Sequence, residues 1–212
     1  MFERATARRR AAIALVLIAV PFAWAATGSV GAQAPDCLPT SARTLGPHAF
    51  PGLRSRPANP VYTDAYQYAL TYVFPSKAKA EADRLNSLGF VSATWQTYVG
   101  KKRKTRGEYG YTVTEQLGSP EQAQADLDRW LAQALRPRRT KQFGVPSIPG
   151  SRGVRQTPNK RHRSAYSFLY FTEGDYYYDV GSEVRGGGSG TAQVIHAGTD
   201  LYDRVHGAPA CP

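Results

Sequence analysis

Two segments of the chain share one pattern of hydrophobic and polar positions. Residues 66–88 and 109–131 align without a gap and are identical at eight positions, including the paired tyrosines that open each segment. Each segment begins with alternating aromatic or aliphatic residues, the period of two typical of a half-buried strand. Each then changes to the spacing of an amphipathic helix. The sequence therefore predicts two strand–helix units of the same kind.

Capping residues mark where these helices begin and end. In the second segment, Ser119 is followed by Pro120 and Gln122, the order of a capping serine, a first-turn proline and a capping-box glutamine. In the first segment, Ser76 is placed to cap a helix, and Gly89 stands where a helix usually stops. We expect a helix to follow the strand in both units.

A looser third copy starts at residue 175, where "DYYYDVGSEV" repeats the alternating strand before a glycine-rich segment and a further amphipathic stretch. Additional strands are predicted just before the second and third copies, at 90–99 and 164–172. Such strand–hairpin–strand–helix units predict an α+β fold, an antiparallel sheet of about five to six strands with helices packed on one face. We expect one domain over 61–212 after an irregular lead-in over 35–60.

The beginning of the chain has the pattern of a secretory signal peptide over residues 1–34. Four arginines among the first ten residues precede an apolar run over 11–26 and the small-residue motif Ala32-Gln33-Ala34. The run of about sixteen residues is shorter than the roughly 20 that a membrane-spanning helix needs. Retention as an uncleaved anchor is the alternative. We therefore expect an exported protein, either secreted or associated with the cell envelope.

Export changes the interpretation of the cysteines and of the charge. Cys37 and Cys211 are the only cysteines, and in an oxidising compartment they predict one disulfide between the two ends of the mature chain. The chain has 27 Lys and Arg against 16 Asp and Glu. Removing four arginines and one glutamate of the predicted signal leaves 23 against 15, a net charge of +8. The mature domain is therefore itself basic.

Three basic runs fall between the predicted strands and helices, in segments rich in glycine and proline. An anion-binding role is assigned to their residues as a hypothesis, with a merely solvated basic surface as the alternative. The candidate residues are Lys101, Lys102, Arg103, Lys104, Arg106, Arg138, Arg139, Lys160, Arg161 and Arg163. Outside a bacterial membrane, the partners that fit are anionic lipid headgroups or wall polymers, with peripheral membrane contact, or a protein partner. Nucleic acid is the least favoured partner, and the sequence indicates no oligomeric state.

No motif points to a metal, a cofactor or a catalytic centre. The four histidines lack HExxH or cysteine–histidine spacing, and "GGGSGT" lacks the spacing of a nucleophile elbow. Asp175, Asp179 and Glu183 alternate along one predicted strand, where acids on its solvent side are ordinary. An exported hydrolase with a scattered active site stays open as an alternative, because the members of a catalytic triad need not be close in sequence.

The tyrosines are numerous, 13 in all, and most fall on predicted strands. Those at equivalent repeat positions are expected to bury their rings under helices: Tyr66, Tyr68, Tyr109, Tyr111, Tyr176 and Tyr178. The directions of Trp95, Tyr98 and Tyr177 are left open. On an uncovered sheet face, such rings would form a platform suited to sugars or apolar ligands.

Three stretches, "VFPSKAKAEADRLNSLGF", "FTEGDYYYDVGSEV" and "YDRVHG", resemble exported or lipid-anchored domains of unknown function from high-GC Gram-positive bacteria. The resemblance implies an envelope location and an α+β fold, and it brings no catalytic residues. The chain departs from the lipid-anchored members because "APDC" is not a lipobox. The function expected from the sequence is a secreted, non-enzymatic binding or sensor-like envelope domain.

Overall fold

The computed structural model describes residues 37–57, 60–100, 108–158, 164–185, 190–209 and 211. The predicted signal peptide and the basic runs at 101–107 and 159–163 lie outside these ranges. Within them, no helix is both long and apolar enough to cross a membrane.

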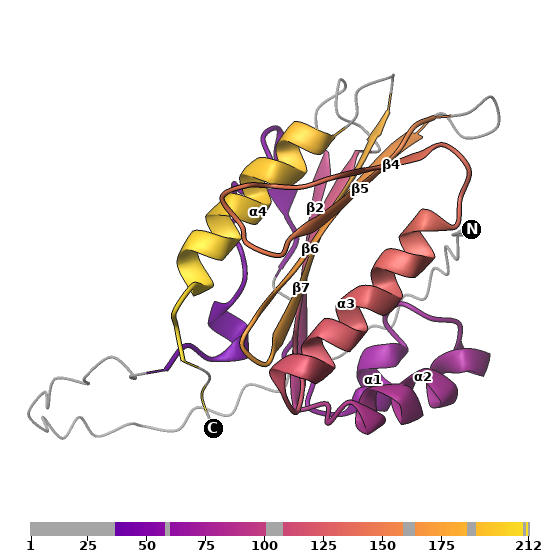
Figure 1. The fold of residues 1–212 in the computed structure, drawn as a ribbon, viewed down its shortest axis with the longest axis vertical. Coiled ribbons are helices and arrows are strands. Elements are labelled where there is room, and N and C mark those ends of the chain that lie inside the picture. The colour runs from indigo at the N-terminus through magenta and orange to yellow at the C-terminus, as the bar shows by residue number, and fades with distance from the viewer. Residues whose placement is uncertain are drawn as a thin grey trace, which may run out of the picture. The chain divides into compact units, whose positions relative to one another are not determined.

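One antiparallel sheet of seven strands, in the order β1-β2-β3-β7-β6-β5-β4, forms the centre of the fold (Figure 1). The predicted α+β antiparallel architecture is confirmed, with more strands than the five to six expected. The strands are β1 (Leu53–Ser55), β2 (Ser92–Gly100), β3 (Tyr109–Gln116), β4 (Thr140–Phe143), β5 (Arg152–Gln156), β6 (Ser164–Glu173) and β7 (Tyr176–Arg185). The helices are η1 (Thr40–Ala42), α1 (Ala65–Ala69), α2 (Pro75–Ser87), α3 (Pro120–Leu135) and α4 (Thr191–Val205).

The helices cover both faces of the sheet, so the prediction that they pack on one face is wrong (Figure 1). Helix α4 packs on the face that carries Leu169 and Phe171, whereas α3 packs on the opposite face with Tyr170 and Tyr177. The reason lies in β6 and β7, where apolar or aromatic residues occupy both alternating sets of positions. A strand of that kind needs cover on both sides.

The first repeat segment begins with a helix, not with the predicted strand. Ala65, Tyr68 and Ala69 of α1 are buried, which is the i, i+3, i+4 spacing of a helix, and Tyr66 is exposed. The Asp64 side chain caps α1 by accepting a hydrogen bond from the Gln67 N–H at 2.7 Å. Helix α2 follows from Pro75, so Ser76 is a helical residue and not its cap. The Ser119 cap of α3 is confirmed.

Residues 37–57 belong to the domain, although the sequence predicts an irregular lead-in there. Strand β1 pairs with β2, and Phe50 and Leu53 are buried in the core under α4. Cys37 and Cys211 form the predicted disulfide, with their Cα atoms 4.9 Å apart.

Arg43 joins the same two ends of the chain. Its guanidinium is buried, lies 4.0 Å from the centre of the Tyr176 ring, and donates hydrogen bonds to the Leu38, Ala208 and Pro209 carbonyls. Its remaining hydrogen bond goes to the Tyr178 hydroxyl at 3.0 Å. The two termini are therefore fixed to each other by a covalent bond and by one side chain.

Candidate functional site

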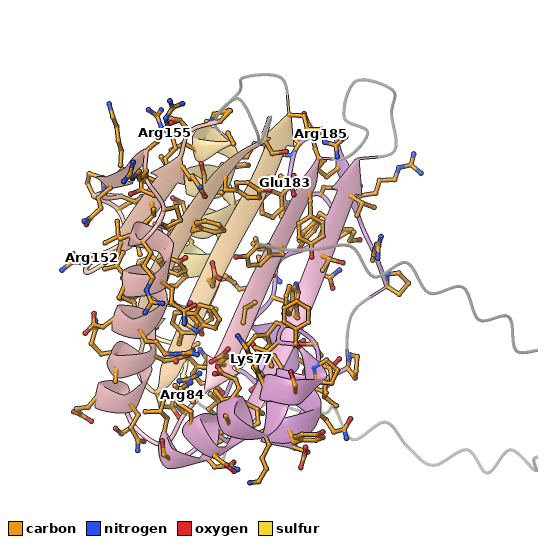
Figure 2. The ribbon with its side chains drawn as sticks, turned by 90° about the vertical axis from the view of Figure 1, so that its right-hand side faces the viewer. Lys77, Arg84, Arg152, Arg155, Glu183 and Arg185 are labelled. Carbon is orange, nitrogen blue, oxygen red and sulfur yellow. A yellow bond between two sulfur atoms is a disulfide. The ribbon has the colours of Figure 1, made fainter. Side chains whose placement is uncertain are left out.

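Five aromatic side chains lie on the α3 side of the sheet: Trp95, Tyr109, Tyr111, Tyr166 and Phe168, here called the aromatic face. All five are half-buried, so the helices on this side leave them partly open to solvent. Figure 2 shows this side of the sheet, with α3 along one border and α1 and α2 at one end. Of the three residues whose directions the sequence left open, only Trp95 belongs to this face, because Tyr98 and Tyr177 are buried. Tyr109 and Tyr111, which were expected to be buried under helices, are only half-buried.

The strand register places β7 through the middle of the aromatic face. Tyr109 of β3 and Tyr166 of β6 both pair with Glu183, and Tyr111 and Phe168 both pair with Gly181. Because alternate residues of a strand point to the same face, Asp179 follows on this side of β7. Rings from two neighbouring strands therefore flank a central strand that carries two carboxylates and a glycine.

Gly181 is the position on which the Tyr111 ring rests. A Cβ atom at residue 181 would overlap the Tyr111 ring at Cε1 and Cζ, closer than any real contact. The missing side chain lets Tyr111 lean across β7 and donate a hydrogen bond from its hydroxyl to Asp179 Oδ2 at 2.9 Å. The glycine in "DVGSEV" thus positions both the ring and the hydroxyl.

Asp179 is a buried carboxylate without a basic partner among the described residues. Its side chain is 9% exposed, and its Oδ1 atom has no hydrogen-bond partner in the described part of the protein. Burial raises the pKa of Asp179 to about 7, against the hydrogen bond from Tyr111, which lowers it. The expectation that this acid faces solvent is therefore wrong, because aromatic neighbours on β3 and β6 cover it.

A second buried acid, Glu115, lies on the same face, where it pairs with Tyr177 of β7. Its Oε1 atom accepts a hydrogen bond from the Tyr68 hydroxyl at 2.6 Å. Burial and the neighbouring charge of Asp126 raise the pKa of Glu115 well above its usual range. Glu115 therefore holds its proton more tightly than an ordinary glutamate does.

An ion-pair network fastens α2 to α3 at this end of the sheet. Arg84 bonds to Glu81 at 2.8 Å and to the buried carboxylate of Asp126, and Arg129 bonds to Glu81 at 2.6 Å. Burial opposes ionisation of Glu81, but Arg84 outweighs it and lowers the pKa of this acid. Trp130 adds a hydrogen bond to Asp126 at 3.2 Å. The network fixes the two helices that border the aromatic face.

Unpaired buried polar atoms gather on this side of the sheet. Seven such side-chain atoms occur among the described residues. Five belong to the aromatic face or to the residues beneath its helices: Trp95 Nε1, Glu115 Oε2, Arg129 Nη1, Tyr177 Oη and Asp179 Oδ1. Buried polar atoms in native proteins are nearly always paired, with protein, water or a ligand. Each of these atoms is fully enclosed, so they mark incomplete hydrogen bonding beneath the surface and not groups that a ligand on the face could contact.

The predicted anion-binding residues are only partly within the described ranges. Arg138 and Arg139 are exposed in the connection before β4. The other eight residues lie in 101–107 and 159–163, outside the described residues. The flanking strand ends share one end of the sheet, because Tyr109 pairs with Glu183, Arg185 with Ser164, and Tyr166 with Gln156.

The described basic residues at that end include Arg155 and Arg185, and Figure 2 shows Arg185 near Glu183. Exposed Lys141 lies on β4 opposite Arg155. Arg155 pairs with Ser167, which pairs with Ser182, so Arg155 and Lys141 lie on the α4 face of the sheet. Of these three residues, Arg185 alone lies on the side of the aromatic face.

The histidines form no catalytic or metal-binding group within the described ranges. His196 lies 3.5 Å from Asp200 and His206 lies 3.1 Å from Glu173, and all of these pairs are on the surface. No group of three His, Cys, Asp or Glu side chains suited to a metal ion occurs among the described residues. His162 lies outside them.

The remaining aromatic residues distribute over both sides of the sheet. Tyr176 and Tyr178 are buried as expected, but on the α4 face. Tyr98 is buried on that face too, donating to the Leu45 carbonyl at 3.1 Å, and Tyr177 is buried under α3. The aromatic face could have been recognised from "SAYSFLYF" and "YGY", where rings recur at every second position, but only if the pairing of β3 with β7 had been known.

No family model matches the chain, and no curated protein sequence matches it. The extracellular domain of PknH from Mycobacterium tuberculosis has a similar crystal structure, with a TM-score of 0.49 and 12% sequence identity. The similarity covers 78% of this chain and 95% of that domain. The similarity is too low to carry a functional conclusion, which must come from the site itself.

Proposed function

We propose that this protein is an exported binding domain of the cell envelope, and that the aromatic face is its ligand-binding surface. The observation that carries the proposal is the group of half-buried rings around Asp179 on a sheet face that helices only partly cover. Ligand sites combine apolar walls with a few fixed polar groups, which is the composition found here.

The location is supported by the signal-peptide pattern and by the disulfide. A single bond between Cys37 and Cys211, with no free cysteine among the described residues, is typical of a protein that folds in an oxidising compartment. An envelope site also suits the basic charge, since wall polymers and lipid headgroups are anionic.

The basic end of the sheet is proposed to attract an anionic envelope component toward the aromatic face. Exposed charges of one sign raise the local concentration of an opposite charge, and salt weakens this effect. The rings would then give contact that salt does not weaken. Two kinds of interaction, one salt-sensitive and one not, distinguish this proposal from a merely solvated basic surface.

The test is sedimentation of the mature domain with isolated bacterial cell wall and with anionic lipid vesicles, at low and high salt. Tyr109→Ala with Tyr166→Ala removes two rings from the aromatic face. Tyr66→Ala is the matched control, because Tyr66 is 42% exposed on α1, away from this face. We expect loss of binding in the first variant and none in the control.

A second variant tests the basic end, with glutamine at Arg138, Arg139, Arg155 and Arg185. We expect it to bind as tightly as the wild type at high salt and more weakly at low salt. A third variant tests the predicted basic loop in the same way, with glutamine at Lys101, Lys102, Arg103 and Lys104. The proposed function would be overturned if all variants bound equally, or if the wild type bound neither the cell wall nor the lipid vesicles.

A further inference from the structure

We infer that the outer edge of β4 binds an extended acidic segment of a partner protein, which adds a strand to the sheet. The inference goes beyond the proposed function, because it concerns another surface and another kind of partner. It depends on two properties of that edge: backbone groups without a partner strand, and positive charges without acidic partners.

Strand β4 is the last strand of the sheet, so its outer side has no neighbouring strand among the described residues. The Thr157 N–H donates to the Arg139 carbonyl, which directs that carbonyl toward the β5 side. Because the backbone groups of successive strand residues alternate in direction, Thr140 and Gln142 direct their N–H and C=O groups away from β5. Lys141 and Gln142 are both exposed, so solvent reaches this edge. The edge therefore presents donors and acceptors at the spacing that another extended chain matches.

The same edge belongs to a stretch of the chain without acidic residues. Residues 129–172 contain ten Lys and Arg and no Asp or Glu. Six of these basic residues lie in or beside β4 and β5 and have no ion pair within the described part of the protein. They are Arg136, Arg138, Arg139, Lys141, Arg152 and Arg155. Figure 2 shows Arg152 and Arg155 at one border of the sheet, which is therefore positive without internal compensation.

Lys141 and Arg155 occupy directly opposed positions of β4 and β5. Like charges at opposed positions of neighbouring strands repel each other and lower stability. The next residue in this row is Ser167 of β6, which brings no negative charge. Neighbouring strands lie about 4.8 Å apart, so a carboxylate opposite Lys141 on an added strand would pair with the lysine. The row of side chains at this edge therefore favours an acidic strand.

A charged edge strand also protects a protein from pairing with copies of itself. Lys141 has that effect here, because a second β4 would bring like charges together. The same charges attract an acidic strand. Edge protection alone excludes every added strand, whereas acidic recognition admits one of opposite charge, so the two explanations predict different results.

Fluorescence anisotropy with labelled peptides and the mature domain tests the inference. The probe is a short peptide of alternating glutamate and threonine. In antiparallel pairing, a glutamate opposite Lys141 places threonine N–H groups toward Thr140 and Gln142. One control peptide is methylated at its threonine N–H groups, and another has lysine in place of glutamate. We expect saturable binding of the probe, binding weaker by about tenfold or more after methylation, and no binding of the lysine peptide.

Two variants locate the binding on the protein. Lys141→Glu reverses the central charge, and Gln142→Pro removes an outward N–H without removing a hydrogen bond to β5. Each should weaken binding of the glutamate peptide about tenfold or more. Lys77→Glu is the matched control, because Lys77 is exposed on α2, which Figure 2 shows at the other end of the sheet, and it should leave binding unchanged. Circular dichroism checks that each variant is folded.

Three results would overturn the inference. The first is that no glutamate peptide binds, which would leave the charges of β4 as edge protection. The second is that binding survives methylation of the peptide or both β4 variants, which would reduce it to general attraction by a basic surface. The third is that the wild type forms dimers in analytical ultracentrifugation and Gln142→Pro does not, which would assign the edge to a second copy. None of these results bears on the aromatic face, whose test uses cell wall, vesicles and ring variants.

Discussion

Replacing Asp179 by asparagine should stabilise the protein at neutral and alkaline pH, although the residue is buried and hydrogen-bonded. The pKa of Asp179 is raised to about 7 in the folded state, from the ordinary value of 3.8. A raised folded pKa means that the native state holds this proton more tightly than the unfolded chain does. Its contribution to stability is therefore complete below about pH 4 and is lost as the pH rises to about 7.

The size of the effect follows from the same rise in pKa. Relative to low pH, ionisation of Asp179 lowers the free energy of unfolding of the wild type by about 4 kcal/mol at about pH 8. At about pH 5 the loss is only roughly 1.5 kcal/mol. The asparagine side chain would not titrate and would keep the Tyr111 hydroxyl as a donor to its amide oxygen. The difference in the free energy of unfolding between the variant and the wild type should therefore shift by about 2.5 kcal/mol in favour of the variant when the pH is raised from about 5 to about 8.

Urea unfolding at the two pH values measures this gain, as the change in the free energy of unfolding at constant m. Glu183→Gln is the matched control, because Glu183 is a half-buried acid on the same face of the same strand, where solvent still reaches the carboxylate. A difference between wild type and Asp179→Asn that does not vary with pH would refute the reasoning. It would show that water or a neighbouring group compensates the buried charge.

The remaining predictions concern the termini and the aromatic face. Replacing Cys37 and Cys211 by serine should lower the free energy of unfolding by up to about 5 kcal/mol, because the bond closes a loop of 174 residues; an unchanged urea midpoint would contradict this. Arg43→Met should lower the free energy of unfolding by about 3 kcal/mol, because it removes charge-assisted hydrogen bonds to both ends of the chain. Arg43→Lys, measured by the same urea unfolding curves, should lose only part of that stability. Gly181→Ala should lower the free energy of unfolding by about 1–3 kcal/mol, because the added methyl group displaces the Tyr111 ring. The melting temperature should fall and ligand binding should weaken. An unaltered melting temperature would show that the ring moves freely.

The disulfide pairing and the fold class could be predicted from residues that act locally or by elimination. Two cysteines allow only one intramolecular pair, and a capping serine with a following proline marks a helix start wherever the helix later packs. The α1 segment shows the limit of this approach. "YQYALTY" fits an alternating strand, yet the Asp64 cap and the burial of Tyr68 against Glu115 decide for a helix.

The sequence alone determined the alternation of rings along β3, β6 and β7, the basic runs, and the presence of Asp179 and Glu183 on one side of a strand. Only the tertiary structure decided what these features form together. The pairing of β3 with β7, across more than 60 residues, places Tyr111 over Gly181 and against Asp179. Burial of that carboxylate is a property of the assembled sheet and its helices, since solvent exclusion depends on neighbours that are distant in the chain.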